Sequence, residues 1–390
     1  MTRTALAALL LAALAGTPMA AAETVESARP GQRPPTGSDE DELWYAMERA
    51  ELDLRQHPLL VRDEALNAYV RKVACDVAED YCGDLRVYIV EQPYFNASMA
   101  PNGMMMVWTG ALLRFQDEAE MALVLGHEFA HFRERHSLEQ WRRAKTSSAF
   151  LNAFGLLAFG TGVGTAGYVA SLLGAAQMYH YSRDAEREAD RLGFAFATAQ
   201  GYDPDAGARL WQRMQDEEAA RRYGKPLPVF ASHPRTAERL EDVRIAAANS
   251  GADGGDSHQD AYRAATRPFL AGWLEDELAR RMYDSSIQVI GDLRKGAGPE
   301  LEATYVFFLG EAFRRRGKPG DAARAEALYE EAIALPDPPA GAFREQGLAL
   351  RAQGRRIEAA AALSEYLTRS PGADDAAFMR QYLDEMEAPP

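Results

Sequence analysis

The spacing of two histidines and a glutamate near the middle of the chain predicts a metal site. His127, Glu128 and His131 form the pattern His-Glu-x-x-His within the segment HEFAH. On a helix the two histidines lie one turn apart on the same face, so both imidazoles can reach a single ion. Glu128 lies about 100° further round the helix, where it can reach a metal-bound water but is badly placed to bind the metal itself. We therefore predict zinc (Zn2+) on the two histidines, with Glu128 as the catalytic base.

The flanking residues predict that residues 117–136 form the helix on which this pattern must lie. Asp117 is a good N-cap residue, and Glu120 three positions later completes the pattern of a capping box. The apolar run that follows is long enough to bury the helix. The alternative is a chance spacing of two histidines on an amphipathic helix. A buried helix does not normally hold two histidines and a glutamate unless they are paired or metal-bound, so we favour the zinc site.

The pattern leaves the third protein ligand open. The extended metzincin pattern would need glycine at position 134 and histidine at position 137, and this chain has Glu134 and Ser137, so that class is excluded. His136 is one residue away from the required position, and we assign it to the end of the helix. The remaining candidates lie on a second helix, predicted over residues 183–200 and ending near Gly201.

Two carboxylates on this second helix lie on one face. Glu186 and Asp190 are four residues apart, whereas Glu188 points away from them. We predict Glu186 as the third zinc ligand and Asp190 as the residue that orients a ligand histidine. The alternative is a solvated acidic face balanced by neighbouring arginines, and that description suits Glu188 best.

Length, charge and the N-terminal segment restrict the class of protein. The chain has 390 residues, 47% of them hydrophobic, which is enough for one sizeable core and a second module. A formal charge of −15 argues against nucleic acid as a partner and against electrostatic binding to an anionic membrane. Residues 1–22 resemble a signal peptide cleaved after about Ala22, with an apolar run too short to span a bilayer. We expect residues 23–38, rich in Pro, Gly and Ser, to be disordered.

The chain has two cysteines, Cys75 and Cys82. In an exported protein they are expected to form a disulfide. On a continuous helix their spacing would hold them roughly 10 Å apart, so a bridge needs a turn between them, and residues 80–83 are suited to one. Two buried free thiols are the alternative.

Before the zinc helix, the pattern predicts helical structure over residues 39–80 and then a small sheet. Residues 85–90 and 104–108 have the composition of strands, and Asn102-Gly103 suits a hairpin turn before the second. The outer strand would either pair with an extended peptide or belong to a plain core hairpin.

The segment after the zinc helix contains no Asp, Glu, Lys or Arg between Lys145 and Arg183. Two interpretations of residues 148–178 stay open. They form a core helical hairpin, or they form two short apolar helices that cover the cleft or make peripheral contact with a membrane surface. A single membrane crossing is unsuitable, because it would place the residues that follow on the opposite side from the zinc helix.

The last third of the chain matches the spacing of tetratricopeptide repeats. We expect a linker at residues 251–267 and a repeat domain at residues 268–390, with an irregular helical bundle as the alternative. Small residues in the pattern would let paired helices approach closely. The clearest unit has pattern residues Phe343, Gly347, Leu350, Gly354, Ala359, Leu363 and Pro371.

Several of these segments together resemble the BepA/HtpX/CAAX-prenyl-protease family of gluzincins. They are HEFAH at 127–131, YSRDAEREADRLG at 181–193, SHP at 232–234, and FNASMAPNG followed by MMMVWTG upstream. The predicted signal peptide and repeat tail narrow the resemblance to the periplasmic BepA-like branch of this family. The resemblance implies a mainly α protein, with an α+β gluzincin-type zinc metallopeptidase domain at residues 39–250 that holds a small β-sheet. An α-helical tetratricopeptide-repeat solenoid would follow.

The resemblance also implies roles for individual residues. Zinc would be held by His127, His131 and Glu186, and His233 could occupy the fourth zinc position and keep the enzyme inactive. Once displaced, His233 could instead act in catalysis by donating a hydrogen bond to the oxyanion. The alternative for His233 is a helix-capping or loop histidine with no role at the metal.

The implied function is that of a periplasmic zinc endopeptidase that degrades misfolded or stalled outer-membrane proteins. Its repeats would dock substrate or the outer-membrane assembly machinery. The tail is shorter than in the longer relatives, so their partners do not transfer directly. An alternative is a chaperone-like assembly adaptor whose protease site is mostly silent. A membrane-embedded protease is a third interpretation, and it depends on residues 148–178 alone.

Overall fold

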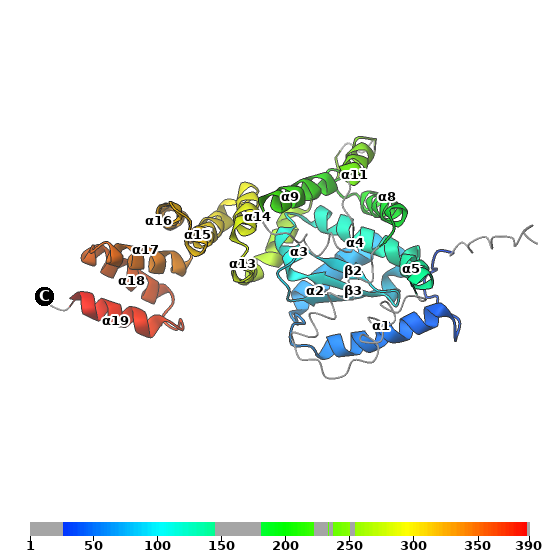
Figure 1. Ribbon diagram of the computed structural model, residues 1–390, viewed down its shortest axis with the longest axis horizontal. Helices are drawn as coiled ribbons and strands as arrows, with labels where there is room; N and C mark the ends of the chain where they lie inside the picture. The colour runs from blue at the N-terminus through cyan, green and yellow to red at the C-terminus, as the bar shows by residue number, and fades with distance from the viewer. Residues whose placement is uncertain (1–25, 145–180, 222–232, 234–236, 250–253, 388–390) are drawn as a thin grey trace, which may run out of the picture.

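The computed structural model describes residues 26–144, 181–221, 233, 237–249 and 254–387. The predicted signal peptide and the apolar segment 148–178 therefore lie outside the described residues. As predicted, the described chain is mostly helical with one small sheet. Figure 1 shows a layered body around the sheet and a row of helices that extends from it to the C-terminus. Within the described residues, no helix has the length and apolar character needed to cross a membrane.

The three strands are β1 (Arg86–Val90), β2 (Ala97–Met99) and β3 (Met104–Trp108), in the order β1-β3-β2. Both predicted strands are present, but the predicted hairpin has a different partner. The turn at Asn102-Gly103 joins β2 to β3, which are antiparallel, whereas β1 runs parallel to β3. Gly103 has φ +89°, and a Cβ atom there would lie 2.1 Å from the carbonyl oxygen of Asp84, so this turn needs glycine.

Both faces of the sheet are covered by helices. Because side chains alternate along a strand, Met104, Met106 and Trp108 pack against α1 (Asp39–Gln56). Met105 and Val107 face the opposite way, into the core that contains α2 (Glu64–Ala78) and α4 (Glu118–Arg133). All five residues of β3 are consequently buried, as expected for a strand covered on both sides.

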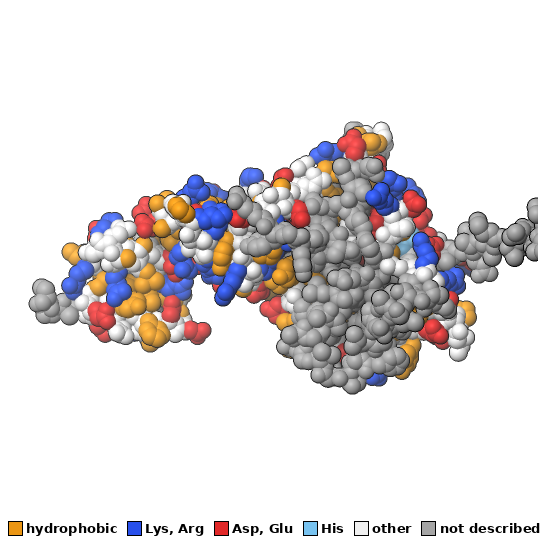
Figure 2. Space-filling model, in the orientation of Figure 1, with side chains coloured by type: hydrophobic (Ala, Val, Ile, Leu, Met, Phe, Trp, Pro, Cys, Tyr) orange, Lys and Arg blue, Asp and Glu red, His pale blue; other side chains and the backbone are white. Residues whose placement is uncertain are grey.

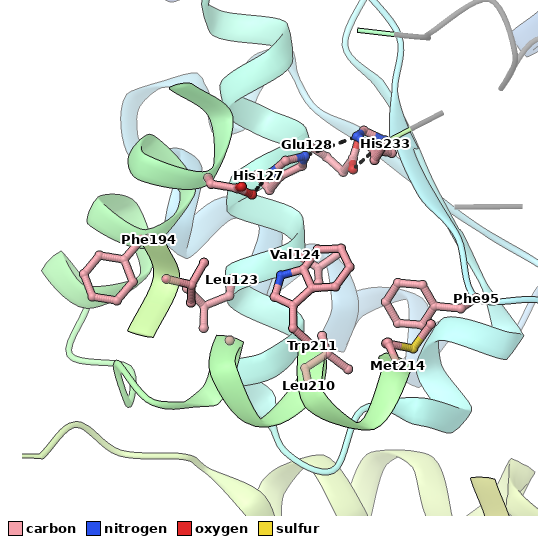
Figure 3. A pocket seen from close by; sticks show the side chains of 13 residues that line it. Phe95, Leu123, Val124, His127, Glu128, Phe194, Leu210, Trp211, Met214 and His233 are labelled. Carbon is pink, nitrogen blue, oxygen red and sulfur yellow. Dashed lines mark hydrogen bonds and ion pairs between the residues drawn. The ribbon is translucent and has the colours of Figure 1, made fainter. Parts of the chain in front are cut away.

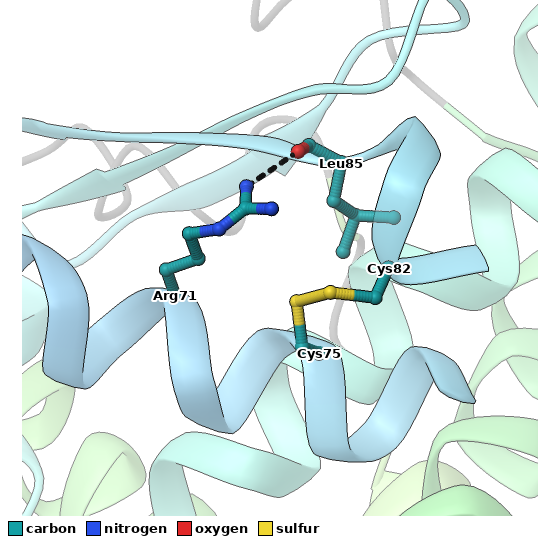
Figure 4. Close-up of a disulfide and its surroundings, with 4 residues drawn as sticks. All are labelled: Arg71, Cys75, Cys82 and Leu85. Atoms are coloured by element: carbon teal, nitrogen blue, oxygen red, sulfur yellow. Dashed lines mark hydrogen bonds between the residues drawn. A yellow bond between two sulfur atoms is a disulfide. The ribbon is translucent and has the colours of Figure 1, made fainter. Parts of the chain in front are cut away.

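A disulfide joins Cys75 and Cys82, as predicted for an exported chain. Helix α2 ends at Ala78, and Glu79 has φ +49° at the start of the 3-10 helix η1 (Glu79–Asp84). This change of direction brings the two sulfur atoms within bonding distance (Figure 4).

Residues 26–38 differ from the prediction of disorder. They contain no helix or strand, but they make defined contacts with the C-terminal end of α4. The amide of Ala28 donates to the carbonyl oxygen of Arg133, and the Tyr81 hydroxyl donates to the carbonyl oxygen of Ala28 at 2.7 Å. These contacts hold the segment in place despite its Pro/Gly-rich composition.

The tail is built from consecutive helices that pack against one another. Gly310 and Gly347 lie where paired helices touch, and a Cβ atom at either would lie 2.7 Å from a side-chain carbon of the partner helix. This close approach is what the predicted repeat pattern requires, although the assignment as tetratricopeptide repeats stays a prediction. Figure 2 shows acidic and basic side chains interspersed over the tail on this face. The helices are α13 (Leu270–Ala279), α14 (Tyr283–Lys295), α15 (Pro299–Arg316), α16 (Asp321–Ala334), α17 (Ala340–Ala352), α18 (Arg356–Arg369) and α19 (Ala376–Glu387).

The segment predicted as a linker contains a packed helix. Helix α12 (Gln259–Thr266) places Tyr262 in the main core, where its ring contacts Phe115 and Tyr69. The same core continues into α13, α14 and α15. Composition suggested a linker because it does not report such long-range packing, and the boundary between the two domains stays a prediction.

Candidate metal centre

The His-Glu-x-x-His pattern lies on α4, whose N-terminus is capped as its sequence suggests. The Asp117 side chain accepts a hydrogen bond from the amide of Glu120 at 2.9 Å. The Glu120 carboxylate accepts from the amide of Gln116 at 2.9 Å, one residue earlier than in a standard capping box. The helix ends at Arg133 instead of continuing to residue 136, because Arg135 adopts φ +54° before α5 (His136–Ala144) begins.

Helix α8 (Arg183–Ala199) lies directly against α4, and two glycines permit this. A Cβ atom on Gly193 would lie 2.5 Å from the backbone nitrogen of His127, and one on Gly126 would lie 3.0 Å from the carbonyl oxygen of Gly193. Gly193 follows Glu186 by seven residues, two helical turns, so both lie on the face turned toward α4. The close packing therefore delivers the Glu186 carboxylate to the two histidines.

Four predicted ligands meet at one point. The ligand atoms of His127, His131, Glu186 and His233 all lie within 4.8 Å of one another. The Nε2 atoms of the two α4 histidines are 3.1 Å apart, and carboxylate oxygens of Glu186 lie 3.8 Å from Nε2 of His127 and 3.6 Å from Nε2 of His131. Nδ1 of His233 lies 2.9 Å from Oε1 of Glu186.

These residues fit a zinc ion. Bond lengths of about 2.0–2.2 Å in a tetrahedral site place ligand atoms roughly 3.4 Å apart, and the separations between the three predicted ligands bracket that value. Glu186 is 1% exposed, and a carboxylate buried among imidazoles needs a positive charge nearby. The donor set of two or three imidazoles and one carboxylate is one that zinc prefers.

The structure also places Asp190 and Glu128 as the predicted mechanism requires. Oδ1 of Asp190 lies 3.0 Å from Nδ1 of His127, so it can accept a hydrogen bond from that imidazole and fix its orientation. Oε1 of Glu128 lies 3.6 Å from Nε2 of His233 and is directed at the metal cluster. Figure 3 shows Glu128 and His233 converging on the same point as His127.

Two residues that orient His131 were missed from the sequence. Nδ1 of His136 lies 2.9 Å from Nδ1 of His131, and Nε2 of His136 lies 3.3 Å from Oε2 of Glu188. With Nε2 of His131 assigned to the predicted metal, its Nδ1 would donate to Nδ1 of His136, and His136 would donate through Nε2 to Glu188. His136 was assigned to a helix end and Glu188 to a solvated face; the break at Arg135 is what returns His136 to the site.

Tyr181 is a further contact that the sequence did not single out. Its ring stacks on His131 with the ring centroids 3.8 Å apart, and its hydroxyl is 2.9 Å from Oγ of Ser137. An aromatic residue just before the N-cap Ser182 could have suggested that it packs against the first helix. Because Tyr181 covers one face of the His131 ring, it restricts the rotation of that imidazole.

The contact between His136 and His131 predicts an effect on metal affinity. In His136→Ala the Nδ1–H group of His131 loses its acceptor, so we expect zinc affinity to fall about 10–100-fold. His136→Gln keeps an acceptor oxygen and should recover part of this loss. Competition with a chelator of known zinc affinity measures both variants. Equal affinities for the wild-type chain and His136→Ala would show that the contact does not orient the ligand.

With the site described, comparisons with known proteins identify its class. Residues 60–247 match the model of peptidase family M48 and include every predicted ligand. This part of the chain is therefore an M48 metallopeptidase domain, and zinc is the metal that it uses.

Two groups of curated relatives resemble the chain over this domain. A Vibrio cholerae protein, named provisionally as a beta-barrel assembly-enhancing protease, is 32% identical over 202 residues, which are 49% of this chain and 41% of that protein. The beta-barrel assembly-enhancing protease of Escherichia coli K12 is 28% identical over 225 residues, 55% of this chain and 45% of that protein. The mitochondrial metalloendopeptidase OMA1 of Schizosaccharomyces pombe is 31% identical over 160 residues, 40% of this chain and 45% of that protein. The chain thus spans less than half the length of each of these relatives.

Proposed function

We propose that this chain is a zinc endopeptidase of the periplasm that cleaves unfolded or misassembled envelope proteins. The observation that carries the proposal is the placement of Glu128 beside a cluster of three zinc ligands. The Cys75–Cys82 disulfide is typical of an exported protein. The names of the bacterial relatives favour substrates in the assembly of outer-membrane proteins.

The chain's own groups supply the proton transfers of peptide hydrolysis. Zinc, when bound, makes water a nucleophile near neutral pH and polarises the substrate carbonyl. Glu128 accepts the proton of the attacking water and returns it to the leaving amine. Asp190 and the pair His136–Glu188 keep the two ligand imidazoles in the tautomer that presents Nε2 to the metal.

His233 is proposed to hold this site closed. Its Nδ1 lies 3.3 Å from Nε2 of His127 and 2.9 Å from Glu186, and it is 3% exposed. This imidazole therefore lies where water and the substrate carbonyl would have to enter. Displacement of His233 would open that position to water and to the substrate carbonyl.

Removing the His233 imidazole is expected to activate the enzyme. In His233→Ala three protein ligands remain, and the fraction of molecules open to substrate rises, so we expect casein cleavage to increase about tenfold. The measurement is the initial rate of casein hydrolysis, together with zinc content.

His258→Ala is the matched control, since His258 is partly exposed and lies outside the metal cluster. An unchanged rate in His233→Ala with zinc retained would contradict autoinhibition. Loss of zinc would instead make His233 a structural ligand.

The experiment that tests the proposed function is metal-dependent proteolysis. We expect the zinc-loaded chain to cleave unfolded casein, a chelator to stop the reaction, and added zinc to restore it. Zinc binding without any cleavage, in both the wild-type chain and His233→Ala, would reject the protease function and leave the adaptor as the better description.

The helical tail is proposed to dock substrate or the outer-membrane assembly machinery. Its paired helices and their mixed-charge surface are suited to protein contacts rather than to nucleic acid. A chaperone-like adaptor with a silent site is the second candidate, favoured by the position of His233 over the metal ligands. If Glu128→Gln causes the same envelope defect in cells as deletion of the whole protein, proteolysis is the function; if Glu128→Gln is harmless, the adaptor is favoured.

A further inference from the structure

A cavity lined by apolar side chains opens directly beside the metal cluster. It lies between α4, α8, α9 (Ala206–Ala220) and α11 (Ala237–Asn249). Figure 3 shows His127, Glu128 and His233 at one end, with Val124, Trp211, Leu210 and Phe194 around the remainder.

The cavity is continuous with the catalytic base. Val124 precedes His127 by three residues and Glu128 by four, so all three lie on neighbouring positions of one helix face. Val124 and Trp211 are only half-buried, so the wall of the cavity next to the base is accessible. When the carbonyl of a scissile bond lies at Glu128, a neighbouring side chain of the same peptide lies at the mouth of this cavity.

The lining of the cavity favours apolar substrate side chains. Among the residues that the structure describes, the polar lining residues are His127, Glu128, Asp190 and His233, and all four belong to the metal centre. Every other lining side chain in the described part of the chain is apolar, and Gly207 has none. Beyond the metal centre, a charged side chain entering the cavity would lose its hydration without gaining a partner among the described residues, which disfavours Asp, Glu, Lys and Arg.

The size of the cavity sets the size of the group that it can hold. Its volume is about 60 Å³, and a single water molecule occupies about 10–15 Å³ of such a cavity. A side chain with several carbon atoms fits that space. Gly207 keeps the wall open, because a Cβ atom there would lie 3.2 Å from Cγ1 of Val243 and 3.4 Å from Cδ1 of Leu123.

We propose that this cavity is the specificity pocket of the peptidase and binds a large apolar side chain, that of Leu, Met or Phe, next to the scissile bond. The proposal rests on the proposed function, because it assigns the substrate class to the same site. Unfolded chains expose such residues, whereas folded proteins mostly bury them. The pocket would therefore also restrict cleavage to unfolded chains.

Two measurements test the pocket, and the first uses cleavage itself. Mass spectrometry of casein fragments identifies the residues on both sides of each cut, and we expect Leu, Met and Phe to be enriched at one of the two positions. Peptides made from the most frequent cut should then be cleaved about 10–100-fold faster, in kcat/KM, with Phe at that position than with Ala or Asp.

The second measurement needs no turnover. Amino-acid hydroxamates bind zinc through the hydroxamate, so their side chains report on the adjoining pocket. We expect the hydroxamates of phenylalanine and leucine to bind the zinc-loaded chain about tenfold or more tightly than those of glycine and aspartate. Equal affinity across the four compounds would overturn the proposal, including the case in which another part of this chain fills the cavity.

A matched pair of variants on α11 separates the pocket from general damage. Val243 lines the cavity, whereas Ile245, two residues later, is 48% exposed and does not. We expect Val243→Phe to reduce the preference for phenylalanine over glycine hydroxamate about tenfold, and Ile245→Phe to leave it unchanged. If Val243→Phe does not fold, Trp211→Ala is used instead, and it should shift the preference toward larger side chains. A preference that neither variant changes would overturn the proposal.

The two measurements also distinguish the pocket from the proposed function. Selective hydroxamate binding without cleavage of any protein would keep the pocket and reject the protease. Casein cleavage without an apolar preference would keep the protease and reject the pocket.

Discussion

Replacing Glu128 with glutamine is expected to reduce casein cleavage by about 100–10,000-fold while zinc stays bound. Glutamine has nearly the same shape as glutamate, but its amide cannot accept the proton of the attacking water. The three predicted zinc ligands are untouched by this change. The measurement is the rate of hydrolysis and the zinc content of the same preparation.

Glu139→Gln is the control for this experiment. Glu139 lies on α5, where its carboxylate pairs with Arg143 at 2.7 Å on the surface, away from the metal centre. We expect its rate to equal that of the wild-type chain. If both variants retain full activity, Glu128 is not the general base.

Replacing Arg114 with methionine is expected to destabilise the fold by about 3–5 kcal/mol. The Arg114 guanidinium is buried and donates to both oxygens of Glu217, at 2.7 and 2.8 Å, and to Glu277 at 2.9 Å. These residues come from α3 (Thr109–Arg114), α9 and α13, so the cluster joins the peptidase domain to the tail. The change would leave the carboxylates of Glu217 and Glu277 buried without the compensating charge and hydrogen bonds of the Arg114 guanidinium.

The dependence of this stabilisation on pH follows from Glu277. Burial acts to raise the pKa of Glu277, but the charges of Arg114 and Arg280 outweigh it, so the pKa lies below its ordinary value of 4.5. The stabilisation from this group is therefore present above pH 4.5 and is lost as the pH falls through the lowered native pKa.

Urea unfolding monitored by circular dichroism measures the loss at neutral pH. Arg369→Met is the matched control, because Arg369 pairs with Glu365 on the exposed face of α18 and should contribute less than about 1 kcal/mol. A midpoint for Arg114→Met equal to that of Arg369→Met would contradict the account of the buried cluster.

The metal site was largely predictable because its information is local. His127, Glu128 and His131 lie within five residues, and helical periodicity alone places Glu186 and Asp190 on one face. Their meeting in space depends on Gly126 and Gly193, whose missing side chains let α4 and α8 touch, and nothing in the pattern of either helix reports on the other.

The features that were missed depend on changes of chain direction. The left-handed conformation of Arg135 turns the chain so that His136 contacts His131. The sequence pattern predicted one continuous helix through residue 136, so this contact was missed. Strand β2 has three residues, too few for an alternating pattern, so the partner of the Asn102-Gly103 turn was misassigned. Tyr262 likewise shows that a polar segment can still contribute a ring to the core.

The most direct test of the account is zinc content measured on the wild-type chain and on two ligand variants. We expect about one zinc per chain in the wild type, and zinc lost on dialysis from both His131→Ala and Glu186→Ala, because each removes one of the three predicted protein ligands. Stoichiometric zinc retained in both variants would show that the metal lies elsewhere, and the assigned centre would be wrong.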